Sequence, residues 1–233
     1  MKENGIDINR HLKIGQEIRA NTRKIVPKTV DNGIIINIPD RMLYFFRDGK
    51  LVSTFPVGLG KATWQTPTGN FRITGKKKNP TWFVPESIQE EMSMRGDPVK
   101  DIVPPGPDNP LGRYALKTTM PSVLIHETIW PTSVYQFRSH GCIRVIPQNM
   151  EKFFGEVDIN TPGEIIYNVF KIAESEDRKI FLEVQLDIYG RVNDLKSAVI
   201  SEIERKGISE RVDWKKVERV LTEKSGIAED ITL

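Results

Sequence analysis

Short apolar runs that alternate with polar residues, separated by turns rich in proline and glycine, constrain the fold of this chain more than any other feature. Isoleucine occupies every second position from Ile34 to Ile38, which is the period of a half-buried β-strand. The pair Asp48–Gly49 comes just before a second β-rich run at 51–57. A pair of this kind between two such runs predicts a β-hairpin.

Further strand-like runs follow along the chain, at 71–74, 114–118, 122–126, 165–170 and 180–186. One helix is predicted at 148–154, and proline-rich loops such as 104–107 interrupt any continuous ladder. Short strands separated by long irregular loops favour a mainly β fold, a sandwich or a barrel. The 233 residues leave room for one such domain and a modest additional piece.

The hydrophobic period changes to that of a helix after Gly190. Leu195, Val199 and Ile203 are spaced by four residues, and Asp213 is a plausible N-cap for a second helix. We therefore expect a polar N-terminal appendage, a β-rich sandwich-like domain and a small helical extension, at 1–28, 29–190 and 191–233.

Composition excludes several classes of protein. A single cysteine, Cys142, allows neither an internal disulfide nor a site with several thiolate ligands. The net charge of +3 is too small and too dispersed to indicate nucleic-acid binding. No run approaches the roughly 18–20 apolar residues of a membrane span, and the first residues lack the apolar core of an export signal.

Chemistry is concentrated in the run Ser139–Arg144, SHGCIR, with His126 upstream at the end of a predicted strand. A cysteine attacks a carbonyl as the thiolate, so Cys142 needs a base. His140 lies only two positions away across a glycine turn and is poorly placed to direct its ring at the sulfur. His126 can approach from a neighbouring strand, and we predict that it is the base.

The neighbours of Cys142 suggest how a substrate would be held. Gly141 lets the backbone approach closely, so the N–H groups of Gly141 and Cys142 are candidates for an oxyanion hole. Arg144 has the planar charge suited to a carboxylate. A zinc site of His126, His140, Cys142 and water is an alternative on ligand type alone.

The run Ser139–Arg144 with His126 upstream resembles the signature of the L,D-transpeptidases, the YkuD-type catalytic domain. Other segments resemble this family in the same order: Ile34–Tyr44, Val57–Gly58, Thr66–Phe71, Asn109–Gly112 with Ala115–Leu116, and Val134–Arg138. The resemblance covers about 34–170. The segment Leu12–Ile18 is similar to the closing residues of a LysM sugar-binding module.

The resemblance implies roles for the residues of the signature. Cys142 would be the nucleophile and His126 the base, with the Glu127 carbonyl orienting the histidine ring. A bulky acid at Glu127 departs from the small residue more usual in the family. His140 would be a supporting hydrogen-bonding residue and Ser139 a wall of the substrate site.

The implied substrate is the tetrapeptide stem of peptidoglycan. Attack at its third residue would release D-alanine and leave a thioester, without a cofactor or metal. A stem amine, a lysine of a surface protein or water could then accept the acyl group, and water would make the enzyme an L,D-carboxypeptidase. This substrate implies a place in the periplasm or cell envelope. A zinc-dependent hydrolase and a non-catalytic cell-wall-binding module remain the alternatives.

Overall fold

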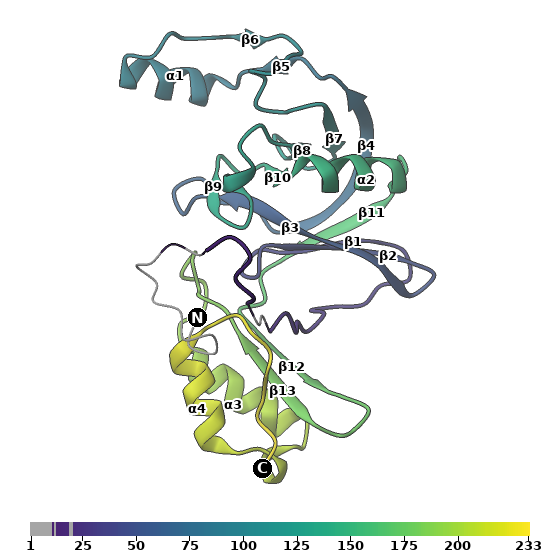
Figure 1. Cartoon of the computed structure of the whole chain (residues 1–233), viewed down its shortest axis with the longest axis vertical. Coiled ribbons are helices and arrows are strands. Elements are labelled where there is room, and N and C mark those ends of the chain that lie inside the picture. The colour runs from purple at the N-terminus through teal and green to yellow at the C-terminus, as the bar shows by residue number, and fades with distance from the viewer. Residues whose placement is uncertain (1–10, 12, 19–20) are drawn as a thin grey trace. The chain divides into compact units, whose positions relative to one another are not determined.

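The computed structural model describes residue 11, residues 13–18 and residues 21–233 (Figure 1). They form two compact units. We call the larger one, residues 26–169 and 185–194, the barrel unit. The smaller one, the C-terminal unit, contains residues 170–184, 195–233 and the described residues up to 25. The sequence-based limits 1–28, 29–190 and 191–233 follow chain order, whereas the packing groups the C-terminal helices with the strands at 170–184.

The strands of the barrel unit form one sheet. In their order across the sheet they are β10 (Ile143–Val145), β8 (Leu124–Glu127), β7 (Tyr114–Thr118), β4 (Gly69–Lys78), β11 (Pro162–Ile166), β1 (Gly33–Asn37), β2 (Met42–Arg47), β3 (Lys50–Gly60) and β9 (Phe137–Ser139). Because β10 pairs with β3 as well as with β8, the strands from β10 to β3 close into a barrel. The mainly β prediction is confirmed, and the expected sandwich is a closed sheet.

Local turn chemistry places the first hairpin as predicted. Asp48 and Gly49 both have positive φ, 51° and 70°, and Arg47 pairs with Lys50 across the turn. Two consecutive residues with positive φ match the twist of the flanking strands. The predicted hairpin is therefore confirmed.

The predicted strand 165–170 is wrong, because the chain leaves the ladder in its middle. β11 ends at Ile166, and Phe170 begins a strand of the C-terminal unit. The side chain of Asn37 accepts from the Asn168 N–H at 2.8 Å and donates to its carbonyl at 3.1 Å. Side-chain bonds thus replace the strand pairing at this point.

The barrel core is closed on one side by α2 (Pro147–Glu156), which confirms the helix predicted at 148–154. Met150 and Phe153 are fully buried. The Phe153 ring lies 5.8 Å from that of Phe45 and 5.6 Å from that of Phe55, as centroid distances. These contacts fix the helix on the sheet.

Between β4 and β7 the chain makes an excursion of β5 (Trp82–Phe83), α1 (Glu86–Arg95) and β6 (Ile102–Val103) (Figure 1). No residue of α1 is buried, and the sequence analysis did not predict this helix. Asn109 holds the two ends of the excursion together, because its buried amide donates to the carbonyls of Pro80 and Val103 at 2.8 and 3.1 Å.

The C-terminal unit packs two helices on a small antiparallel sheet (Figure 1). Its elements are β12 (Phe170–Glu174), β13 (Ile180–Val184), α3 (Leu195–Arg205), the short 3-10 turn η3 (Ser209–Arg211), α4 (Trp214–Glu223) and β14 (Glu229–Asp230). Asp213 caps α4 as predicted, accepting from the N–H of Lys215 at 2.9 Å and of Lys216 at 3.3 Å. In the described part of the chain, no helix is both long and apolar enough to span a bilayer.

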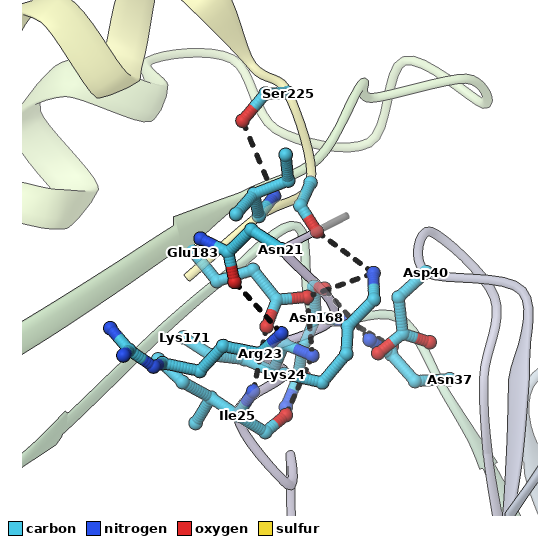
Figure 2. A network of polar contacts seen from close by, with 12 residues as sticks. Asn21, Arg23, Lys24, Ile25, Asn37, Asp40, Asn168, Lys171, Glu183 and Ser225 are labelled. Carbon is cyan, nitrogen blue, oxygen red and sulfur yellow. Dashed lines mark hydrogen bonds and ion pairs between the residues drawn. The ribbon is translucent and has the colours of Figure 1, made fainter. Parts of the chain in front are cut away.

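A buried ion pair lies within the C-terminal unit (Figure 2). The Glu183 carboxylate accepts from Lys171 Nζ at 2.9 Å, and both side chains are almost completely buried. Its other oxygen accepts from the Ile25 N–H at 2.7 Å, while Lys171 donates to the Ile25 carbonyl at 2.7 Å. The pair thereby holds the segment before residue 26. Of the LysM-like segment Leu12–Ile18, Leu12 lies outside the described residues, as do 1–10 and 19–20 of the predicted appendage.

Candidate active site

Parallel pairing of β8 with β10 brings the two halves of the predicted site onto neighbouring strands. Ile143 pairs with Ile125 and Arg144 with His126. Both isoleucines are buried in the barrel core. Because side chains alternate along a strand, His126 and Arg144 lie on the opposite face from them, and Cys142, two residues before Arg144, comes just before β10 on that side.

The His126 ring is held in one orientation. Its Nδ1 lies 2.5 Å from the Glu127 carbonyl oxygen, which can only accept a hydrogen bond. Nδ1 therefore carries the proton, and Nε2 of the neutral ring has its lone pair available. Burial lowers the pKa of His126 to about 4, the bond to Glu127 opposes this, and the charge of Arg144 adds to the lowering.

The surroundings of Cys142 favour its protonated form. Its Sγ lies 3.5 Å from the Ser122 carbonyl oxygen. Burial raises the pKa of the thiol above its ordinary value, although the Leu124 backbone and the Arg144 charge act to lower it. The raised pKa of the thiol and the lowered pKa of the imidazole both favour the neutral forms over a thiolate–imidazolium pair.

Ser139 shapes the turn before the cysteine. Its Oγ donates to the Cys142 carbonyl at 2.6 Å and accepts from the Gly141 N–H at 3.2 Å. The Gly141 N–H is therefore engaged, whereas the Cys142 N–H has no acceptor among the described residues. Of the two predicted oxyanion donors, Cys142 is the one that has no acceptor in this structure.

His140 faces the excursion. Its Nε2 contacts the Glu91 carboxylate of α1, and Lys61 Nζ lies 3.3 Å from the same carboxylate. The Trp64 ring meets the His140 ring edge-on at 5.0 Å. Sequence reasoning missed Glu91, Lys61 and Trp64, and Glu91 carried no signal because it lies on a helix with no buried residue.

Arg144 is half-buried, and no acidic partner contacts it among the described residues. Its guanidinium lies 5.5 Å from the centroid of the Trp130 ring, and 47% of Trp130 is exposed. Burial lowers the pKa of Arg144, while the Cys142 sulfur acts in the other direction. The site thus has a fixed positive charge beside the thiol, with one exposed aromatic face.

The Glu127 side chain points away from His126. It accepts from Arg113 Nε at 3.3 Å, and a Cβ at Gly112 would lie 2.7 Å from the Glu127 side chain. Only the carbonyl of Glu127 contacts the predicted base. The bulky acid is accommodated because position 112 is a glycine with a φ of +65°.

The ligand set of the zinc alternative is not brought together. His126 holds the Glu127 carbonyl and His140 holds Glu91. Within the described part of the chain, no three His, Cys, Asp or Glu side chains are grouped so that they could hold a metal ion.

Comparison with known proteins identifies the family of this chain. A family model described as the L,D-transpeptidase catalytic domain, YkuD, matches residues 31–165. The Escherichia coli protein named probable L,D-transpeptidase ErfK/SrfK is 33% identical over 175 residues, covering 74% of this chain and 56% of the relative. The protein named probable L,D-transpeptidase YbiS, also from Escherichia coli, is 31% identical over 174 residues with the same coverage.

Among solved structures, an Enterococcus faecium L,D-transpeptidase is similar, with a TM-score of 0.46 and 25% identity over 59% of this chain and 50% of that chain. The chain spans about half the length of the curated relatives it matches.

Proposed function

Since this chain belongs to the L,D-transpeptidase catalytic-domain family, we propose that it acts on peptidoglycan stem peptides through a thioester on Cys142. The observation that carries the proposal is the contact between His126 Nδ1 and the Glu127 carbonyl. It leaves Nε2 as a base on the strand next to the cysteine. A base is required because the resting thiol is protonated.

In the acylation step, Cys142 Sγ attacks the carbonyl of the third stem residue, and the thiol proton passes to His126 Nε2. The C–S bond forms and the carbonyl oxygen becomes an oxyanion, which the Cys142 N–H can stabilise. The C–N bond to the terminal D-alanine then breaks, and His126 returns the proton to the departing amine. The product is an acyl thioester on Cys142.

In the transfer step, an amine attacks the thioester and gives a proton to His126. The C–S bond breaks, and the thiolate recovers that proton. One amide is exchanged for another, so neither step requires an oxidant, a reductant or a metal. A stem amine, a surface-protein lysine and water are the three candidate acceptors, and product analysis distinguishes them. Because this polymer lies outside the cytoplasmic membrane, we place the protein in the periplasm or cell envelope.

Arg144 fits the recognition of a substrate carboxylate. It is a fixed charge beside the thiol and contacts no acid among the described residues. A planar guanidinium binds a carboxylate through two parallel hydrogen bonds. We assign it the terminal carboxylate of the stem peptide, whose departure as D-alanine completes acylation.

The test is mass spectrometry of the intact chain after incubation with meropenem, a β-lactam that acylates nucleophilic thiols. We expect one adduct on Cys142 and none in Cys142→Ala. Incubation with sacculi should then change the muropeptide profile with the wild type and leave it unchanged with Cys142→Ala. A folded wild-type chain that forms no adduct and changes no muropeptide would refute the proposed enzyme.

A further inference from the structure

A half-buried tyrosine outside the matched residues 31–165 is connected through Thr66 to the turn that carries Cys142. Tyr189 lies in the segment 185–194, which belongs to the barrel unit. Its hydroxyl donates to the Gly60 carbonyl at 2.6 Å and accepts from the Thr66 N–H at 3.2 Å. Burial raises the pKa of Tyr189, although the bonds with Thr66 act to lower it, so the phenol keeps its proton.

Thr66 continues this connection to the signature turn. Its hydroxyl donates to the Gly141 carbonyl at 2.9 Å and accepts from the Gly60 N–H at 2.9 Å. Thr66 is fully buried, so water does not compete for these bonds. Tyr189 and Thr66 thus join the peptide groups of Gly60 and Gly141.

The segment that carries Tyr189 is itself held firmly. The Asp187 carboxylate accepts from the Tyr167 hydroxyl at 2.6 Å and from the N–H groups of Arg191 and Val192 at 3.0 and 2.8 Å. The rings of Tyr167 and Tyr189 stack, with centroids 5.5 Å apart and planes 18° apart. Because Tyr189 is fixed in this way, its hydroxyl can hold Gly60 and Thr66 in place.

Gly141 requires an external constraint. Its φ of +104° lies in the region that favours glycine, and because glycine has no Cβ, its own torsions restrict the orientation of the following peptide group least. That peptide joins the Gly141 carbonyl to the Cys142 N–H. Because a trans peptide is planar, holding the carbonyl with Thr66 directs the Cys142 N–H to the opposite side.

We propose that Tyr189 and Thr66 are positioning residues that direct the Cys142 N–H at the developing oxyanion. This inference rests on the proposed function, since it concerns the same acylation step. Neither side chain touches the substrate. Both act through the peptide between Gly141 and Cys142, and the part of the chain beyond the matched family region contributes to the site through Tyr189.

Two reactions of the same thiol separate positioning from general support of the fold. Acylation by meropenem passes through an oxyanion, whereas alkylation by iodoacetamide displaces iodide at a saturated carbon and forms none. Both need an accessible Cys142 whose thiol proton can be removed. A variant that only loosens the turn changes both rates, whereas a variant that misdirects the N–H slows acylation alone.

The experiment measures both second-order rate constants in the full chain for the wild type and four variants. Thr66→Val and Tyr189→Phe remove the hydroxyls, Thr66→Ser restores one, and Tyr44→Phe is the matched control. Tyr44 lies in the barrel unit and is buried, and its hydroxyl donates to Asp40 at 2.9 Å. Loss of one oxyanion donor costs about 10²–10³-fold in a serine protease, so misdirecting the donor here should slow acylation at least about tenfold.

We expect Thr66→Val and Tyr189→Phe to slow acylation at least about tenfold with alkylation unchanged, and Thr66→Ser and Tyr44→Phe to acylate near the wild-type rate. Acylation at the wild-type rate in both hydroxyl-free variants would overturn the inference and leave the proposed function intact. Equal slowing of both reactions would also overturn it, because the residues would then support only the fold. A wild type that is alkylated but never acylated would overturn the inference together with the proposed function.

Discussion

At the scale of single residues, His126 is kept neutral by its surroundings through the pH range in which most histidines titrate. Burial lowers its pKa to about 4, against an unfolded value of about 6.5. The base is thus available at mildly acidic pH. We expect the acid limb of meropenem acylation to fall near pH 4; a limb near 6.5 would contradict the burial of this ring.

The same lowered pKa makes stability depend on pH. Between about pH 4 and 6.5, His126 is protonated in the unfolded chain and neutral in the folded chain. The free energy of unfolding is therefore unaffected by this group above about pH 6.5. It falls by roughly 3 kcal/mol in all as the pH drops towards 4. Urea unfolding of the wild type and of His126→Gln across this range should show a shallower pH dependence in the variant.

The thiol gives a second prediction. Because burial raises the pKa of Cys142, alkylation by iodoacetamide should be slow at neutral pH and should accelerate only above the ordinary thiol pKa of about 8.5. The measurement is the alkylation rate against pH, with His126→Gln as the comparison. A plateau that begins below neutral pH would instead indicate a stable thiolate–imidazolium pair.

Arg144 allows charge and shape to be tested separately. Arg144→Lys keeps a positive charge beside the thiol but loses the planar fork. We expect alkylation close to the wild-type rate and turnover of a tetrapeptide substrate reduced about tenfold or more, mainly through a higher KM. If both rates fall equally, the arginine supports the turn and does not hold the substrate carboxylate.

At the scale of elements, the excursion depends on few contacts. No residue of α1 is buried, and Glu91 links the helix to His140 and Lys61. Hydrogen bonding to His140 lowers the pKa of Glu91, burial opposes this, and Lys61 lowers it further. The link is therefore complete above the ordinary glutamate pKa and is lost as the pH falls through the lowered value.

Substitution of Glu91 should loosen the helix without disturbing the barrel. We expect Glu91→Ala to speed hydrogen exchange of residues 86–95 about two- to fivefold, the size of effect that partly exposed ion pairs produce, and to leave residues 114–127 unchanged. Glu90→Ala, an exposed position on the same helix, is the matched control. Equal exchange in the two variants would show that Glu91 does not hold α1.

Features that depend on residues close in sequence could be predicted, whereas features that depend on residues far apart in sequence could not. The Asp48–Gly49 turn and the Asp213 cap depend on residues close in sequence, so the local sequence predicted both. Closure of the barrel by β3 and β10 joins strands far apart in the chain, and no local pattern encodes that pairing. The end of β11 depends on Asn37, whose bonds to Asn168 span 131 positions.

The site divides in the same way. Cys142 and His126 could be proposed from the sequence because Cys142 stands between a glycine and, two residues on, an arginine, and because His126 stands at a strand end. Thr66 could be found only as part of a segment resembling the family, without its bond to Gly141. Glu91 and Tyr189 lie far from the signature in sequence, and only folding brings Glu91 to His140 and Tyr189 to Gly60 and Thr66.

At the scale of the whole molecule, each unit has its own apolar core. Ile203 is fully buried in the core of the C-terminal unit, and Phe153 is fully buried in the core of the barrel unit. The residues assigned to catalysis, Cys142 and His126, lie in the barrel unit, as does Tyr189. A cavity in one core should therefore have different consequences from a cavity in the other.

We expect Ile203→Ala to destabilise the C-terminal unit by about 2–5 kcal/mol, because a buried isoleucine is replaced by a void. Hydrogen exchange of residues 195–223 should accelerate strongly, while meropenem acylation of Cys142 stays near the wild-type rate. Phe153→Ala should create a cavity of similar cost in the barrel core. We expect it to accelerate hydrogen exchange of residues 114–127 and to slow acylation of Cys142. If Ile203→Ala slows acylation as much as Phe153→Ala does, the two cores unfold together and the site depends on both.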